Sequence, residues 1–282
     1  MLSFDHRREG IGYLESYLDK REMALRILEN LESGIEADDV LKNHIEYCLQ
    51  NKITDGIRFA LEEIKKSSRS YEIRNFSLKT VVQLSDELSE IEMILPDISD
   101  EFKWNIVEEL VNQNSKMVVD YLEDVLSTGN DKDKIKASEY LIKLQNIEAL
   151  EYYSNWIKNN NQLNRDMYNS STLTYLKNIA AIPILIDLLE LTYKETFNQP
   201  DIFDRLDSLV QGALKSIALE SEINYLKVRQ AILDFIERNM NIYKNVNWLY
   251  SFLNQLEQQY YINKSEKIDV NDVINKLESI GL

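Results

Sequence analysis

Histidine and cysteine, the side chains that most often act as bases, nucleophiles and metal ligands, are scarce in this sequence. The chain has 282 residues with two histidines, His6 and His44, and one cysteine, Cys48. No His-Glu-x-x-His pattern occurs, and a single cysteine cannot build a structural zinc site. Cys48 lies in an apolar helical stripe, so we expect a buried, unreactive thiol. We expect His44, beside the same stripe, to be a histidine at the core boundary rather than a general base.

Acidic residues are abundant, but their spacing does not single out a catalytic pair. The carboxylates of Glu62 and Glu63 are adjacent, so on a helix they point to different faces, where they are normally solvated. Asp204 and Asp207 lie three positions apart, a spacing that could hold a ligand, although we expect a solvated face there. The phosphate-binding pattern Gly-x-x-x-x-Gly-Lys-Ser/Thr is absent. We therefore predict no catalytic residue, no cofactor-binding residue and no metal ligand, and we expect the chain not to be an enzyme.

The aromatic residues suit a role in binding another protein rather than in catalysis. The sequence has 16 tyrosines and 3 tryptophans, and Tyr152, Tyr153 and Trp156 fall on one predicted helix. Tyr153 and Trp156 occupy the apolar stripe of that helix, so we expect them in the core. Tyr152 lies one position off the stripe and is our candidate for a partner-binding surface, because tyrosine gives a large contact area with little loss of side-chain entropy.

The elements that must position these residues follow a repeat. Apolar segments end at spacings of 31, 31, 31 and 32 residues, at Ile64, Leu95, Leu126, Ile157 and Leu189. When Ser115–Leu126, Asn146–Ile157 and Asn178–Leu189 are aligned, apolar residues coincide at four positions that share one helix face. Glycine and proline, at 7 and 3 residues, are too rare for a strand-rich fold. These patterns predict an all-α fold, an α-solenoid of helix-turn-helix repeats.

We expect the repeats to form a single array over residues 1–282. The units are clearest at 99–189, and longer, irregular helices are predicted at 200–282. One of these longer helices carries a predicted core stripe, and the chain finishes with a short predicted helix, Val270–Ile280. The predicted stripe consists of Ile223, Leu226, Ala231, Leu233 and Ile236.

Two families share features with these segments. Ile135–Leu144 and Ile179–Leu189 resemble the first and second helices of a HEAT-like repeat, which implies a solenoid that binds other proteins. The segments Tyr153–Lys158 and Glu257–Tyr261 resemble the C-terminal repeat region of bacterial STAND/NACHT-type NTPases. That second resemblance implies the sensor or regulatory part of a larger protein, with the nucleotide bound elsewhere.

The net charge and the hydropathy pattern restrict the classes of partner and the cellular location that we expect. The net charge of −16 repels phosphate backbones, so we expect a protein partner, no nucleic acid and no membrane. No apolar run reaches the length of a membrane span, and Met1–Gly10 is polar, so we expect a cytoplasmic protein. Two alternatives stay open: an enzyme on a HEAT-like scaffold, such as a DNA glycosylase or a chromophore lyase, and a free-standing adaptor.

Overall fold

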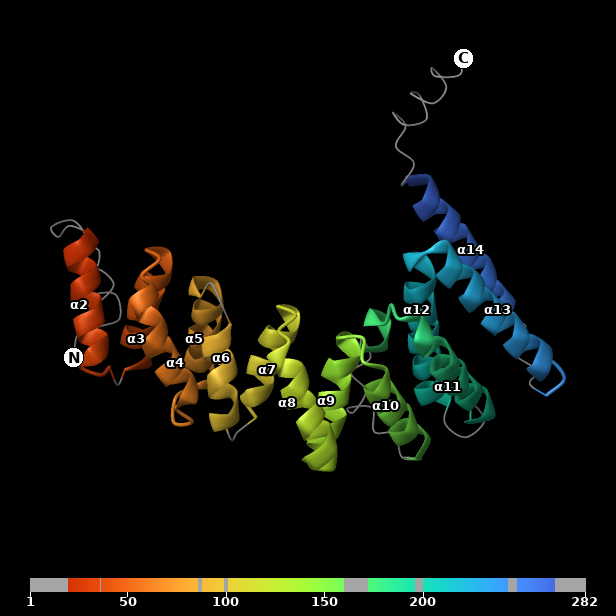
Figure 1. Cartoon of the computed structure of the whole chain (residues 1–282), viewed down its shortest axis with the longest axis horizontal. Helices are drawn as coiled ribbons and strands as arrows, with labels where there is room; N and C mark the ends of the chain where they lie inside the picture. The colour runs from red at the N-terminus through yellow and green to blue at the C-terminus, as the bar shows by residue number, and fades with distance from the viewer. Residues whose placement is uncertain are drawn as a thin grey trace, which may run out of the picture. The chain divides into compact units, whose positions relative to one another are not determined.

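The protein is all-α, as the sequence predicts. The computed structural model describes residues 20–35, 37–85, 88–98, 101–159, 172–195, 200–242 and 248–266, and these residues form α-helices and short 3-10 helices with no strand among them (Figure 1). Two compact units divide the chain, Met1–Asp120 and Tyr121–Leu282, and the boundary falls inside helix α8. The single array over residues 1–282 stays a prediction.

In the first unit, alternate helices pack on one another. Helix α3 contacts α2 and α5, helix α4 contacts α5 and α6, and helix α5 also contacts α7. The 3-10 helix Thr54–Gly56 leads into α4, and a second one, Leu95–Asp97, follows α6. The helices are α2 (Lys20–Glu32), α3 (Asp38–Gln50), α4 (Ile57–Lys65), α5 (Tyr71–Leu84), α6 (Ser89–Ile94), α7 (Lys103–Asn112) and the start of α8 (Met117–Thr128).

In the second unit, helices become longer toward the C-terminal side. Pro183 lies in the first turn of α11 and Pro200 begins α12, positions that suit proline because it lacks an N–H that the first turn does not need. Helix α13 packs on α11, α12 and α14. The helices are α9 (Asp131–Lys143), α10 (Ile147–Asn159), α11 (Ile182–Glu195), α12 (Pro200–Glu220), α13 (Glu222–Asn239) and α14 (Trp248–Glu266), with 3-10 helices at Thr172–Tyr175 and Ile179–Ala181.

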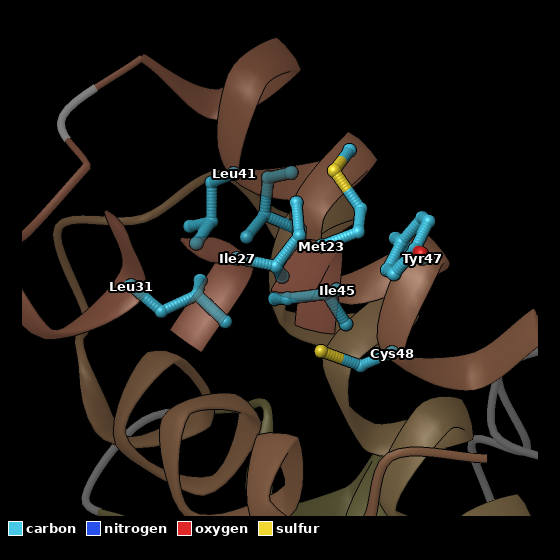
Figure 2. Close-up of a cluster of buried hydrophobic side chains, with 8 residues drawn as sticks. Met23, Ile27, Leu31, Leu41, Ile45, Tyr47 and Cys48 are labelled. Atoms are coloured by element: carbon cyan, nitrogen blue, oxygen red, sulfur yellow. The ribbon is translucent and has the colours of Figure 1, made fainter. Parts of the chain in front are cut away.

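The core at the start of the first unit shows how helical spacing selects the buried face. Figure 2 shows Met23, Ile27 and Leu31 of α2 gathered with α3 side chains such as Ile45 and Cys48. Met23, Ile27 and Leu31 recur every four residues, so they share one side of α2. Leu25, which also has helical spacing with Leu28, is exposed instead.

Three turns between helices have the same backbone structure and recur in phase with the repeat. Lys52, Asn114 and Gln145 all have positive φ, and they lie two periods and one period of 31 residues apart. In each turn this residue donates its N–H to the carbonyl three positions earlier, and the next residue donates to the carbonyl five positions earlier. This pair of bonds is the Schellman ending of a helix, usually built on glycine. The donors and acceptors are Lys52 to Leu49 and Ile53 to Cys48, Asn114 to Val111 and Ser115 to Leu110, and Gln145 to Ile142 and Asn146 to Leu141.

A side-chain bond between consecutive helix pairs also recurs after one period. Ser115 donates to the carboxylate of Glu92 on α6, and Asn146 donates to Glu123 on α8 at 3.0 Å. Both bonds join residues 23 positions apart, and the second pair lies 31 positions after the first. Equivalent residues in the sequence therefore make equivalent contacts in the structure.

Other contacts join residues that are themselves about one period apart. In the first unit the rings of Tyr71 and Phe102 meet edge to face, with centroids 5.7 Å apart. In the second unit the side chain of Gln145 bridges to the segment after α10. Its Nε2 donates to the carbonyl of Tyr175 at 2.7 Å, and its Oε1 accepts from the backbone N–H groups of Lys177 and Asn178 at 2.7 and 3.2 Å. Residues about one sequence period apart are thus joined by polar as well as apolar contacts.

Candidate functional site

Tyr152, the residue selected from the sequence, lies half-buried on α10. Burial raises the pKa of its phenol, and the negative charge of Asp131 raises it further. Its neighbour Tyr153 is buried, and the Tyr153 and Trp156 rings lie 6.0 Å apart, which confirms the core position of Tyr153, whereas Trp156 is only half-buried. The role of Tyr152 in partner binding stays a prediction.

His44 is fully engaged in hydrogen bonds inside the first unit. It is buried rather than at the core boundary, so the sequence-based expectation is wrong in that respect. Its Nδ1 lies 2.8 Å from the carbonyl of Val40 and its Nε2 lies 3.2 Å from Nδ2 of Asn30. A neutral ring that donates from Nδ1 and accepts at Nε2 satisfies both contacts. Burial lowers the pKa of His44, and the bond to Val40 opposes this only in part.

Cys48 is buried beside a glycine that leaves room for it, as the sequence predicts. A Cβ placed on Gly56 would come within 2.8 Å of both the Cβ and the Sγ of Cys48, so a side chain at position 56 would not fit. Burial, followed by the charge of Asp55, raises the pKa of the Cys48 thiol to about 11. The thiolate that a nucleophile requires is therefore scarce near neutral pH.

Glu63 corrects the prediction that the paired carboxylates are solvated. Glu62 is exposed, but Glu63 is buried, and its two oxygens accept from Nζ of Lys66 and Nε of Arg69, both at 2.5 Å. Arg69 also donates to Asp38 at 3.0 Å, 31 positions earlier. The buried carboxylate thus anchors an ion-pair network that fastens the loop after α4 to the start of α3.

Asp207 is a second buried carboxylate where a solvated face is predicted. It lies on the buried face of α12 with Val210 and Leu214, three and seven positions later. One oxygen accepts from Nε2 of Gln211 at 2.8 Å. Burial and the Asp207 charge raise the pKa of Tyr193, whose ring lies 5.7 Å from that of Phe235. The side chain of Asp204, the other half of the proposed pair, lies outside the described side chains.

Large apolar side chains are exposed where α13 begins and α14 ends. Four large side chains stand open there, and we call them the hairpin-end patch: Ile223 at 66%, Leu226 at 54%, Tyr261 at 56% and Ile262 at 54% relative exposure. Patches of this kind often mark interaction sites on soluble proteins.

Fixed contacts hold the two helix ends of this patch together. The rings of Tyr225 and Tyr260 stack at 4.3 Å with an interplanar angle of 10°, and Tyr261 meets Tyr260 edge to face at 5.6 Å. Lys264 pairs with Glu222 at 3.2 Å across the same ends. The exposed side chains therefore sit on a preformed support, so a partner would not have to order it.

Sequence reasoning assigned two of these residues to the core. The predicted stripe on α13 contains Ile223 and Leu226, but the buried face consists of Tyr225, Val228, Ile232, Phe235, Ile236 and Asn239. Both sets have helical spacing, and the buried one includes the larger aromatic residues. Counting Tyr225 and Phe235 in the pattern would have identified Ile223 and Leu226 as surplus apolar residues.

Other classes of site find no support in the part of the chain that the structure describes. Within it, no group of three or more His, Cys, Asp or Glu side chains is arranged to hold a metal ion. None of the described helices combines the length and the apolar character needed to cross a bilayer. Comparisons of the chain with models of protein families, with curated proteins and with solved structures find no match.

Proposed function

We propose that the protein is a non-catalytic α-solenoid of HEAT-like repeats that binds a protein partner. Three features support the solenoid: turns that recur in phase, a side-chain bond that recurs after 31 residues, and packing between alternate helices in the first unit. In a stack of similar repeats each unit contacts chiefly its neighbours, so equivalent turns and contacts are expected to recur from one unit to the next. His44, Glu63 and Asp207 hold structural hydrogen bonds, so we assign them no catalytic role.

The hairpin-end patch is the observation that carries the binding proposal. Covering a large apolar side chain completely is worth about 1.5–3 kcal/mol, so exposed apolar residues on a preformed support can anchor an interface. The net charge of −16 attracts basic proteins over a distance of about one Debye length, roughly 8 Å at physiological salt. We therefore infer a partner of basic net charge that presents an apolar helix face. In the STAND-type interpretation, this partner would be the molecule that the sensor detects.

Capture experiments with the full chain test the proposal. We expect a discrete protein from the source cells to bind the wild-type chain, and the double variant L226D/Y261D to lose it at least about tenfold, because charge replaces the apolar anchors. Met93 on α6 is equally exposed, so M93D is the matched control and should keep the partner. Equal capture by L226D/Y261D and the wild type, with helix content unchanged, would contradict the proposal.

A further inference from the structure

Helix α14 has an exposed face that carries almost no charge. It is the last helix that the structure describes, and the predicted helix Val270–Ile280 lies outside the described residues. The 16 residues Trp248–Asn263 include one charged side chain, Glu257, although 28% of the whole chain is charged. Because charged residues are depleted at the centre of protein interfaces, this face is suited to contact another protein chain. The neighbouring helix α13 differs, since it exposes the charged side chains of Glu222, Lys227, Arg229, Asp234, Glu237 and Arg238.

Four exposed side chains on α14 are spaced symmetrically, and we call them the α14 stripe: Tyr250, Asn254, Glu257 and Tyr261. They lie at i, i+4, i+7 and i+11, so they share one side of the helix. A tyrosine stands at each end of the stripe, with an amide and a carboxylate between them. The gaps of four, three and four residues are the same in either direction along the helix. The buried side of α14 consists of Leu249, Phe252, Leu256 and Tyr260.

The symmetric spacing makes the α14 stripe complementary to an antiparallel copy of itself. A two-fold axis through its middle sets Tyr250 opposite Tyr261 of the second copy, and Asn254 opposite Glu257 of the second copy. Tyrosine rings pack favourably on each other, and the amide of Asn254 can donate to the carboxylate of Glu257. Each contact occurs twice, once on either side of the axis.

The charge of the chain also favours this face as the place where two copies meet. Two chains that each carry a net charge of −16 repel each other. The α14 stripe brings a single carboxylate from each copy into the contact, and that carboxylate faces an amide. A second copy therefore meets less repulsion here than on a helix face with several acidic side chains.

We propose that the protein forms a two-fold dimer through antiparallel contact of the α14 stripe with its copy. The stripe spans about 17 Å along the helix, so the contact is small and belongs with the weak, reversible interfaces. We expect a dissociation constant in the micromolar range. The dimer requires no other partner. Tyr261 also belongs to the hairpin-end patch, whereas Asn254 and Glu257 do not.

Sedimentation velocity of the full chain, from about 1 μM to about 500 μM, measures the dimer. N254D should weaken it at least about tenfold, because the new carboxylate faces Glu257 of the second copy twice in each dimer. The double variant N254D/E257Q exchanges the amide and the carboxylate between the two positions and should restore the dimer. Q255D is the matched control: it adds the same charge about 100° around the helix and should keep the wild-type dissociation constant.

Each of these measurements can contradict the dimer. A chain that stays monomeric over the whole range, or equal effects of N254D and Q255D, would overturn the proposal. Failure of N254D/E257Q to restore the dimer would overturn the antiparallel register. Added salt should tighten the dimer, because it screens the repulsion between the two acidic chains, and a dimer that salt weakens would also count against the proposal. N254D leaves the hairpin-end patch intact and should capture as much partner as the wild type, so the dimer and the proposed function can fail separately.

Discussion

At the scale of residues, the polar groups that most resemble catalytic residues serve the packing of this protein. His44 has both ring nitrogens within hydrogen-bond distance of a partner, Glu63 is held by two cations, and Asp207 accepts from Gln211. A buried polar group without such partners costs about 1–3 kcal/mol, so each of these networks contributes to the stability of the fold. Most of these partners lie within six positions of the buried group. Sequence spacing still does not distinguish a catalytic carboxylate from a structural one of this kind, because packing against other helices decides which carboxylate is buried.

His44 predicts how stability depends on pH. Its pKa in the folded chain lies below the ordinary value of 6.5, because burial disfavours the charged ring. Between these two pKa values the unfolded chain binds more protons, so the contribution of His44 to stability is fully present above pH 6.5 and is lost as the pH is lowered. One such group contributes at most about 1.4 kcal/mol per pH unit.

Urea unfolding at pH 7.5 and at pH 5.5 measures this effect. The variant H44Q keeps an amide that can donate to Val40 but removes the titrating ring, so its stability should change less between the two pH values than that of the wild type. His6 is present in both proteins, so any difference in pH dependence between them reflects the change at position 44. An identical pH dependence for H44Q and the wild type would show that His44 does not titrate differently on folding.

At the scale of elements, the turns after α3, α7 and α9 connect local sequence to the repeat. Each uses a left-handed residue that is not glycine, at Lys52, Asn114 and Gln145. The left-handed conformation costs a residue with a Cβ about 1–2 kcal/mol in conformational free energy. The Gln145 side chain makes three hydrogen bonds to the segment after α10, and these bonds can offset the cost of the left-handed backbone at this position.

Glycine substitutions at these turns should therefore have opposite effects. K52G removes the strain of the Cβ, which stabilises the folded chain. It also raises the entropy of the unfolded chain, which lowers stability by about 0.4–1 kcal/mol. We therefore expect K52G to be about as stable as the wild type or up to about 1 kcal/mol more stable. Q145G gains the same backbone freedom but loses the three side-chain bonds to the segment after α10, and we expect a loss of about 1–3 kcal/mol. Chemical denaturation of both variants gives the comparison. If Q145G were as stable as K52G, the Gln145 bridge would not contribute to stability.

Much of the element structure follows from the sequence, but the choice of buried face does not. The helix starts at Pro183 and Pro200 are predictable, because proline and helix caps act locally. The faces of α2 and α13 are not, because Leu25 and Ile223 have helical spacing just as Met23 and Tyr225 do. Only the neighbouring helices decide which of two apolar stripes is covered. The hairpin-end patch consists of Ile223 and Leu226 from the stripe that was left uncovered on α13, together with Tyr261 and Ile262 of α14.

At the scale of the whole molecule, the proposed solenoid would account for turns and side-chain bonds that recur after 31 residues. Equivalent turns and equivalent bonds occur in both compact units, at Asn114 and Ser115 in the first and at Gln145 and Asn146 in the second. An array of this kind is held together by contacts between neighbours, so it tolerates the gain or loss of a complete unit. A globular domain with contacts between distant segments does not.

Deletion of one period tests the repeat most directly. Removing Ser115–Gln145 joins Asn114 to Asn146, so Asn146 takes the position of Ser115 and can donate to Glu92. Removing Ser115–Ser138 instead breaks the phase of the repeat and serves as the control. The repeat predicts that circular dichroism of the in-phase deletion shows the helix content per residue of the wild type and a cooperative melting transition, while the out-of-phase deletion loses both. Equal loss of helix and cooperativity in the two deletions would contradict the repeat.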